Sequence, residues 1–321
     1  MKKILSTLIA LFMVQMILGC SSDSSEDAPV HTTSSRDDGA VKLEIALSGS
    51  LQNPAFSPDG KRIVFTHFRN GYNEPPSDLY TFDLETKVLK VLMRDGNSNV
   101  NLPGESWNGA INAIAFSSDK EPHDEIYYID ENGSTGDEIK ITEREDDVAY
   151  EPTFSPDGQW VVFESHLLDE EGNGVITKYR RDGTSGYITL TALDGNCKQP
   201  NWSATGDKIL YQQEEDGQWD IWVMDASGIN KTKVTNFEGS KTDAVFSADG
   251  EYVIFSAENS ETELANIYKV RITGGDPLRL TNYSAYDGAP SISHDGRKLV
   301  FESVDRDPDV STGTSLWILD L

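Results

Sequence analysis

Several polar residues share one offset within a repeated pattern, so their side chains could converge on a ligand. The offset, three residues before the first residue of a recurring string such as FSPDG, is held by Asn53, Ala113, Glu151, Gln199, Asp243 and Ala289. The four polar members are two carboxylates and two amides, which suit a cationic or polyhydroxylated group. Alternatively, these side chains hydrogen-bond neighbouring backbone and hold repeats together, and the sequence leaves both interpretations open.

Residues suited to catalysis are sparse. No G-x-S-x-G nucleophile motif occurs, so hydrolase chemistry has no support from the sequence. Of the five histidines, only His67 and His166 follow predicted second strands, and they lie in different repeats. A catalytic zinc site uses three protein ligands, so these two histidines do not define one. The sequence therefore favours a binding protein over an enzyme without settling the point.

Three acidic segments could be read as calcium loops: EREDD (143–147), DEEGNG (169–174) and DRDPD (305–309). None matches the twelve-residue calcium loop, in which oxygen ligands converge from one tight turn. We expect solvated turns at these places and no cofactor, although one structural calcium ion would be compatible with the composition.

Trp107 lies in the longest segment between predicted strands, residues 95–110. An exposed indole on a long loop could contact a sugar ring or a partner, because long loops on rigid scaffolds often carry function. Alternatively, Trp107 covers the edge of an irregular second repeat.

The string that defines the offset occurs six times. It reads FSPDG at 56–60 and 154–158, FSADG at 246–250, and in weaker form FSSDK at 116–120, WSATG at 202–206 and ISHDG at 292–296. Proline, aspartate and glycine in this order predict the tip of a β-hairpin, with the glycine at positive φ. A period of about 40 to 50 residues indicates a repeat architecture.

Each tip is followed by segments that alternate as strands do. Examples are WVVF (160–163), DIWVMD (220–225) and TKVT (232–235). Four antiparallel strands per repeat predict an all-β, six-bladed propeller. Residues 41–47 would supply the missing outer strand of the last blade by pairing with 315–321, and the second blade is expected to be short or irregular.

This succession of segments resembles the TolB-type propeller repeat, a relative of the WD-type repeat that is also found in the propellers of prolyl oligopeptidases. The resemblance covers residues 41–321. It implies a fold used for protein docking, ligand binding and sometimes catalysis, so fold alone does not give the function.

The first twenty residues resemble a bacterial lipoprotein signal. Lys2 and Lys3 precede an apolar stretch, residues 4–18, which ends in Ile-Leu-Gly-Cys. By this resemblance, residues 1–19 would be removed and Cys20 would be lipidated, with Ser21 favouring the outer membrane. The polar, acidic segment 20–40 would be a flexible tether, and 41–321 the propeller.

The chain is acidic, with 54 Asp and Glu against 27 Lys and Arg and a net charge of −27. Such a surface repels nucleic acid and anionic lipid, so membrane contact would rely on the lipid anchor. Apart from Cys20 the chain has only Cys197, which is expected to be an inert packing residue.

These observations lead to two hypotheses. The first is an envelope lipoprotein, on the periplasmic or surface-facing side, whose TolB-like propeller binds an envelope protein partner or a small polar ligand through Asn53, Glu151, Gln199 and Asp243. The second is a carbohydrate-active protein, either a uronate-polysaccharide lyase or a glycan binder, with Trp107, His67 and His166 near its site.

Overall fold

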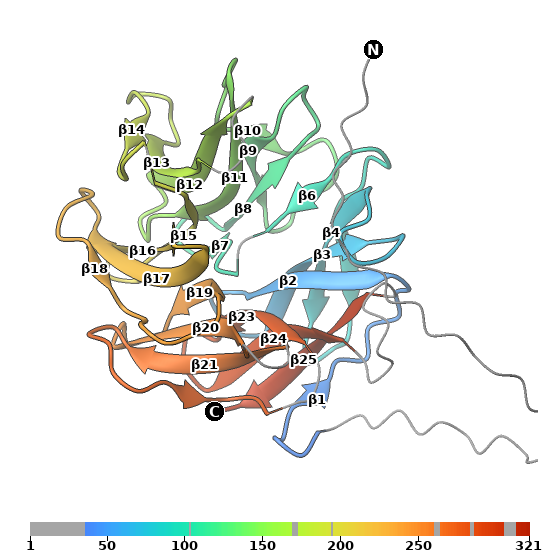
Figure 1. The fold of residues 1–321 in the computed structure, drawn as a ribbon. Coiled ribbons are helices and arrows are strands. Elements are labelled where there is room, and N and C mark those ends of the chain that lie inside the picture. Colours follow the sequence, from blue (N-terminus) through green and yellow to red (C-terminus); the bar gives the residue numbers. More distant parts are fainter. Residues whose placement is uncertain are drawn as a thin grey trace, which may run out of the picture. The chain divides into compact units, whose positions relative to one another are not determined.

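The described residues form six antiparallel sheets around one axis (Figure 1). The computed structural model describes residues 36–102, 104–168, 173–193, 195–259, 264–282, 286–304 and 313–321. The predicted signal peptide and most of the predicted tether lie outside them. No helix occurs in these ranges, and so none that could cross a membrane.

The first blade shows the order of strands. From the axis outward it contains β2 (Ser50–Phe56), β3 (Arg62–Phe68), β4 (Ser77–Asp83) and β5 (Leu89–Met93). The inner three strands are almost wholly buried because both of their faces are covered by neighbouring blades. In β2 only Asn53 is partly exposed, and it lies at the central channel.

Four further blades repeat this order. Blade 3 consists of β11 (Asp147–Phe154), β12 (Trp160–Leu167), β13 (Val175–Arg180) and β14 (Ile188–Thr189). Blade 4 consists of β15 (Cys197–Trp202), β16 (Lys208–Glu215), β17 (Gln218–Asp225) and β18 (Thr232–Lys233). Blade 5 consists of β19 (Lys241–Phe246), β20 (Tyr252–Glu258), β21 (Ala265–Arg271) and β22 (Leu278–Arg279). Blade 6 consists of β23 (Asp287–Ile292), β24 (Lys298–Val304), β25 (Thr314–Asp320) and β1 (Val41–Lys42).

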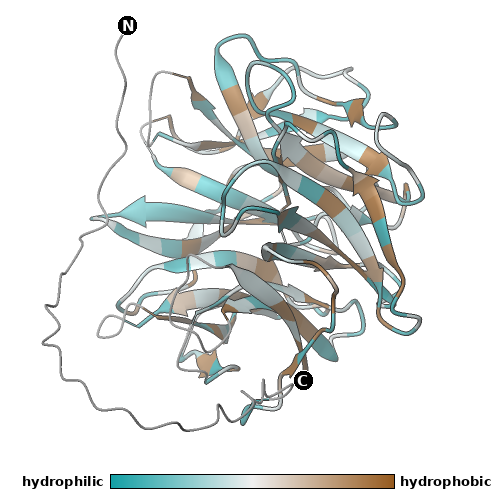
Figure 2. Ribbon diagram, turned by 90° about the vertical axis from the view of Figure 1, so that its right-hand side faces the viewer, coloured by the Kyte–Doolittle hydropathy of each residue, from teal (hydrophilic) through white to brown (hydrophobic). Residues whose placement is uncertain are grey.

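The hydrophobic core is divided among the six interfaces between blades. Each buried cluster contains residues of two neighbouring blades; in one of them Phe65 of blade 1 packs near Val300 of blade 6. Figure 2 shows the hydrophobic residues along the strands, while the connecting loops are mostly hydrophilic. Burial between flat blades is the main stabilising contribution in such a ring.

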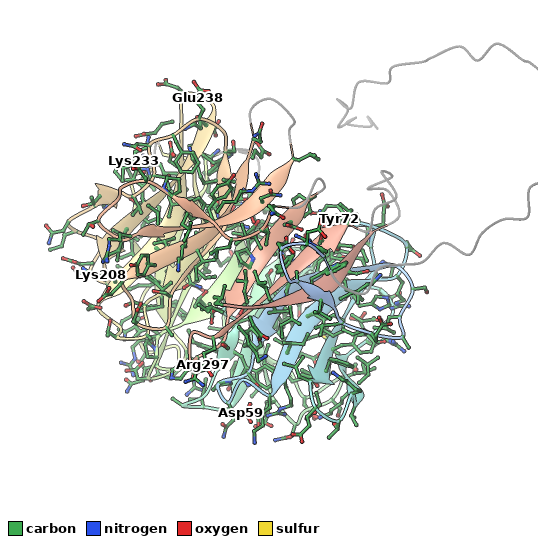
Figure 3. All side chains as sticks on the ribbon, turned by 90° about the horizontal axis from the view of Figure 1, so that it is seen from below. Asp59, Tyr72, Lys208, Lys233, Glu238 and Arg297 are labelled. Atoms are coloured by element: carbon green, nitrogen blue, oxygen red, sulfur yellow. The ribbon has the colours of Figure 1, made fainter. Side chains whose placement is uncertain are left out.

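The hairpin tips have the predicted turn. Ser57 Oγ donates to Asp59 Oδ1 over 2.6 Å, and Asp59 Oδ1 also accepts from the backbone N–H of Lys61. The glycines adopt the positive φ that the string predicts, 69° at Gly60, 66° at Gly158 and 70° at Gly250. The tips therefore define one face of the propeller, here called the tip face. In Figure 3 the tip residues Asp59 and Arg297 lie on the side away from Tyr72 and Glu238.

Blade 2 is irregular, as expected, but the irregularity lies in its innermost strand and not in its second strand. It consists of β6 (Val100–Asn101), β7 (Trp107–Asn108), β8 (Ala113–Ser118), β9 (Glu125–Asp130) and β10 (Ile139–Lys140). Both β6 and β7 pair with β8, so the innermost strand is split into two short pieces and the second strand is complete.

The tip of blade 2 is therefore not FSSDK, and that assignment was wrong. Phe116 pairs with Tyr127 on the third strand, just as Phe65 pairs with Tyr80 in blade 1. Phe116 thus belongs to the second strand. The true tip is WNGAIN (107–112), because Trp107 pairs with Ile114 as Phe56 pairs with Ile63.

The ring closes with strands from both ends of the propeller, as predicted. Val41 pairs with Ile318, Lys42 pairs with Trp317, and the N–H of Leu43 donates to the carbonyl of Leu316. The outer strand β1 is shorter than the predicted 41–47 and completes the sheet of blade 6 (Figure 1). Because β1 pairs with β25, blade 6 has four strands and β25 is not left as an open edge.

Just before β1, Arg36 fixes the chain to blade 6. Its guanidinium forms hydrogen-bonded ion pairs with Asp38 at 2.6 Å and Asp287 at 2.7 Å. It also lies over the rings of Phe301 and Trp317, at 5.4 and 5.3 Å. The pKa of Arg36 is raised although burial lowers it, because hydrogen bonds to Asp287 and Asp38 favour the charged form.

Candidate functional site

The positions predicted to form the polar ring coincide with a bulge in the innermost strand of five of the six blades. Five of its members have a left-handed backbone, with φ between 45° and 54°: Asn53, Glu151, Gln199, Asp243 and Ala289. The pairing of the first and second strands shifts register at these positions. A bulge of this kind turns a side chain away from the regular alternation of the strand, here toward the central channel.

The sixth member of the ring is Gly104 and not Ala113. With the tip of blade 2 at Trp107, the residue three positions earlier is Gly104. A Cβ atom on Gly104 would lie 2.8 Å from the carbonyl oxygen of Pro290 and 3.3 Å from Val245 Cγ1. Only glycine fits there without movement of the backbone of blade 6.

The ring encloses a small inner cavity of about 20 Å³. Its lining includes Asn53, Gly104, Glu151, Gln199, Asp243 and Ala289. Gln199 Nε2 donates to Asp243 Oδ1 over 2.8 Å and to Glu151 Oε1 over 3.1 Å, so three predicted residues are in direct contact. Asn53 instead donates to Asn101 Oδ1 of blade 2. The inner ring therefore joins blades, as the alternative interpretation expected, and also lines a cavity.

Buried carboxyl groups surround the inner cavity. Burial raises the pKa of Glu151 above its usual range, and the neighbouring Glu164 raises it further. Burial also raises the pKa of Glu302 to about 8, although the N–H of Asn53 donates to Glu302 Oε2 over 2.9 Å and lowers it. At neutral pH these groups are largely protonated, so the channel carries less negative charge than its composition suggests.

A larger cavity opens above the inner ring on the tip face. It has a volume of about 310 Å³ and is lined by tip residues of all six blades. We call it the funnel. One apolar side chain from each blade forms its walls: Phe56, Trp107, Phe154, Trp202, Phe246 and Ile292. Asn201 lines both the funnel and the inner cavity, so the two cavities lie one behind the other.

Trp107 is not the exposed loop residue that a contact with a sugar ring or a partner would require. Its side chain is 8% exposed and packs in the core between blades 1 and 2. The guanidinium of Arg62 lies 4.9 Å from the centre of its ring. The indole thus belongs to the funnel wall, in the position that Phe56 occupies in blade 1.

The structure does not bring His67 and His166 together. His67 is buried in blade 1, where Nε2 lies 2.6 Å from the carbonyl oxygen of Ser48. His166 of blade 3 stands beside Tyr150, with 5.3 Å between ring centres. Within the described ranges, no three His, Cys, Asp or Glu side chains are grouped as metal ligands.

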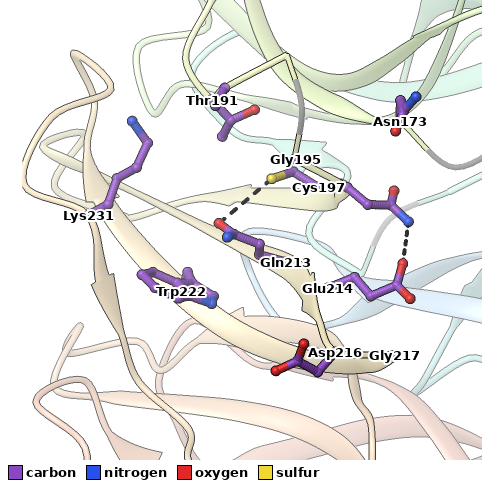
Figure 4. Close-up of a pocket in the computed structure, with 12 residues that line it drawn as sticks. Asn173, Thr191, Gly195, Cys197, Gln213, Glu214, Asp216, Gly217, Trp222 and Lys231 are labelled. Atoms are coloured by element: carbon purple, nitrogen blue, oxygen red, sulfur yellow. Dashed lines mark hydrogen bonds between the residues drawn. The ribbon is translucent and has the colours of Figure 1, made fainter.

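A cavity of about 520 Å³ between blades 3 and 4 was not anticipated (Figure 4). Gln213, Glu214, Trp222 and Lys231 are among the side chains that line it. Cys197 also lines it, 3.9 Å from Gln213 Oε1, and burial raises the pKa of its thiol to about 11. Cys197 is thus a packing residue in thiol form, as expected.

Glu105 is the site residue that the sequence analysis missed. It lies between Gly104 and Ser106 in the split strand and lines the funnel. Its Oε1 accepts hydrogen bonds from Ser291 Oγ and the N–H of Ile292, both in blade 6. Alignment of GESWNGA (104–110) with the other tips would have placed it beside the ring.

Comparisons with known proteins agree with this fold. A family model described as the TolB beta propeller domain matches residues 183–312. The Tol-Pal system protein TolB of Francisella tularensis is 31% identical over 182 residues, which cover 54% of this chain and 40% of that protein. The chain thus spans about two fifths of the length of the TolB relatives it matches.

Two solved structures show the same fold at low sequence identity. TolB from Acinetobacter baumannii superposes with a TM-score of 0.62 at 19% identity, covering 83% of this chain and 65% of that chain. Oligogalacturonate lyase from Vibrio parahaemolyticus superposes with a TM-score of 0.56 at 14% identity, covering 88% and 93%. These likenesses show the propeller fold, and the matched family model and the TolB relatives support a repeat of the TolB type in it.

Proposed function

We propose that this protein is a lipid-anchored component of the cell envelope whose propeller binds a protein partner through the funnel. The similarity to Tol-Pal system TolB proteins supports a role in protein interaction at the envelope. The lipoprotein-like box that ends at Cys20 supports the anchor, although it lies outside the described residues.

The observation that carries the proposal is the funnel itself. All six blades contribute their tips to it, so the whole ring converges there on a single opening. Its apolar walls give contact area, and polar groups stand at its base, the usual composition of a binding site. A side chain or a narrow loop of a partner fits a volume of about 310 Å³.

The polar ring forms the deeper part of the same proposed site. Glu151, Gln199 and Asp243 are joined by hydrogen bonds, and Glu151 Oε2 has no partner. A partner group that reaches the base of the funnel would meet these side chains next.

The test is to fill the funnel without disturbing the blades. Ala204 is an exposed tip residue that lines the funnel, so Ala204→Trp should occupy it. The matched control is Val88→Trp, at a residue that is 61% exposed beside β5, away from the funnel. Both variants and the parent protein are used as bait on detergent-solubilised envelopes.

We expect partner capture to fall at least tenfold with Ala204→Trp and to remain unchanged with Val88→Trp. Equal capture of the same partner by all three baits would show that the funnel is not the docking site. Thermal melts of both variants check that the fold is retained.

The anchor is tested separately. Cys20→Ala should move the protein from the membrane fraction to the soluble fraction, because the lipid-bearing side chain is lost. If the variant stays in the membrane fraction after a salt wash, some other attachment holds it and the lipoprotein assignment is wrong.

A further inference from the structure

Blade 2 sends part of its innermost strand across the channel to blade 6. Between β6 and β7, Gly104 comes close to the backbone of Pro290, and Glu105 accepts hydrogen bonds from Ser291 and Ile292. Blade 1 stands between blades 2 and 6 in the ring, so these contacts reach over the axis. The crossing places the Glu105 carboxyl at the base of the funnel.

The carboxyl of Glu105 has no cationic partner. Its two hydrogen bonds are long, 3.3 Å from Ser291 Oγ and 3.5 Å from the N–H of Ile292, and both end on Oε1. No Lys or Arg occurs among the described residues that line the funnel. Burial raises the pKa of Glu105 to about 8, and no neighbouring charge contributes to the shift. A partly buried carboxyl that lacks a compensating cation is more costly to ionise than one in water.

A second acceptor among the funnel residues also lacks a partner. Asn201 is 3% exposed, lines both cavities, and its Oδ1 makes no hydrogen bond. Unpaired buried polar groups are uncommon in native structures and call for an explanation. The lining of the funnel therefore contains a carboxyl without a cationic partner and an amide oxygen without a hydrogen bond.

The walls above these acceptors favour a cation. The rings of Phe56, Phe154 and Trp202 are among those that line the funnel, and aromatic faces attract ammonium and guanidinium groups. The net charge of −27 draws cationic partners toward the protein.

We propose that Glu105 is the specificity-determining residue of the funnel and selects a partner segment that inserts a Lys or Arg side chain. This inference rests on the proposed docking function. On binding, Glu105 releases its proton to solvent, and its carboxylate pairs with the inserted cation.

The probe is a matched pair of small molecules, N-acetyl-lysine methylamide and its side-chain-acetylated, neutral analogue. Binding to the detergent-solubilised full chain is followed by the indole NMR signals of Trp107 and Trp202. We expect the cationic probe to shift both signals saturably and the neutral analogue to cause no saturable shift. Similar binding of the two probes would overturn the proposal.

Glu105→Gln keeps the shape and hydrogen-bonding capacity of the side chain but cannot ionise. Affinity for the cationic probe should fall at least tenfold in this variant. In the parent protein, affinity should rise from pH 6.5 to 9 as Glu105 ionises more readily, and this rise should be absent in Glu105→Gln. His294 is the other titratable side chain among the described funnel residues, so His294→Gln should keep the rise.

Glu214→Gln, in the cavity between blades 3 and 4, makes the same change of charge elsewhere and should leave probe affinity unaltered. The outcomes also separate this inference from the docking function. If Ala204→Trp abolishes partner capture while Glu105→Gln changes neither probe affinity nor partner capture, the funnel is a docking site and the proposed role of Glu105 is wrong.

Discussion

At the scale of single residues, the protein buries carboxyl groups around its axis that are stable mainly in their neutral form. Glu302 shows how this is tolerated: the N–H of Asn53 donates to Oε2, and the hydroxyl of Tyr72 donates to Oε1 over 3.4 Å. Glu302 belongs to blade 6 and Asn53 to blade 1, so the carboxyl also joins two blades.

Replacing Glu302 with Gln should make the stability of the protein less sensitive to a rise in pH between about 4.5 and 8. Because its pKa is raised to about 8 in the folded state, the parent protein holds a proton that the unfolded chain releases above its ordinary pKa near 4.5. The parent therefore loses stability relative to Glu302→Gln as pH rises through that window, by at most about 1.4 kcal/mol per pH unit. Urea denaturation from pH 4 to 9 measures the difference, and parallel curves would contradict the assignment.

The inner ring yields a second prediction. Glu151→Gln combined with Asp243→Asn should weaken partner capture several-fold while the melting temperature changes little. Gln199 Nε2 can still donate to a carbonyl oxygen on each substituted side chain, so the contacts between blades survive. Capture is measured as for the funnel variants. Full capture would restrict the site to the funnel, and a large loss of stability would mean that the ring serves only to hold blades together.

At the scale of the elements, the tips of the blades depend on glycine to different degrees. Gly250 has φ of 70° and a Cβ there would meet no atom within 4 Å, so Gly250→Ala should cost only the backbone strain of about 1 kcal/mol. Gly158 has φ of 66°, but a Cβ would lie 2.6 Å from Ile111 Cγ2 of blade 2.

Gly158→Ala should therefore destabilise the protein more than Gly250→Ala, as measured by chemical denaturation. Adding Ile111→Ala to the Gly158→Ala variant should reduce its extra cost, since the side chain in the way is then removed. Equal destabilisation by the two glycine variants would show that the tip of blade 2 does not pack against blade 3 in this manner.

Much of the architecture could be predicted from the sequence because each tip is a local structure. Ser57, Asp59 and Gly60 form a turn whose hydrogen bonds all lie within six residues, so the string alone specifies it. The polar ring could be predicted because its residues stand at a fixed offset before the tips, and Gln199 does contact Glu151 and Asp243.

Blade 2 could not be predicted correctly because a similar string occurs on the wrong strand. FSSDK has the letters of a tip, but Phe116 lies on the second strand and pairs with Tyr127. The true tip begins at Trp107, and WNGAIN (107–112) lacks the Asp-Gly pair that occurs in four of the other tips. The crossing of Gly104 and Glu105 to blade 6 is a contact between distant parts of the chain, which no local pattern reveals.

At the scale of the whole molecule, closure depends on a short segment held by one arginine. The Arg36 guanidinium is almost wholly buried between Asp38 and Asp287, and Asp287 is fully buried. Arg36→Met should destabilise the protein by about 3 to 5 kcal/mol, because it leaves buried carboxylates without a counter-charge.

Chemical denaturation of the full chain measures the effect of Arg36→Met. Adding Asp287→Asn should restore part of the lost stability, since one uncompensated charge is then removed. If Arg36→Met is as stable as the parent, residues 36–42 do not hold the ring closed.

The pairing of β1 with β25 also sets the order in which the protein can mature. Val41 is among the first propeller residues to leave the ribosome, and its partner Ile318 is among the last. Blades 1 to 5 can form as the chain emerges, but blade 6 must wait until β25 has also emerged. Until then the inner strands next to the seam have no neighbouring blade, and their apolar faces are open to a chaperone. A nascent chain that stops before β25 would therefore remain an open arc, and proteases should distinguish it from the finished ring.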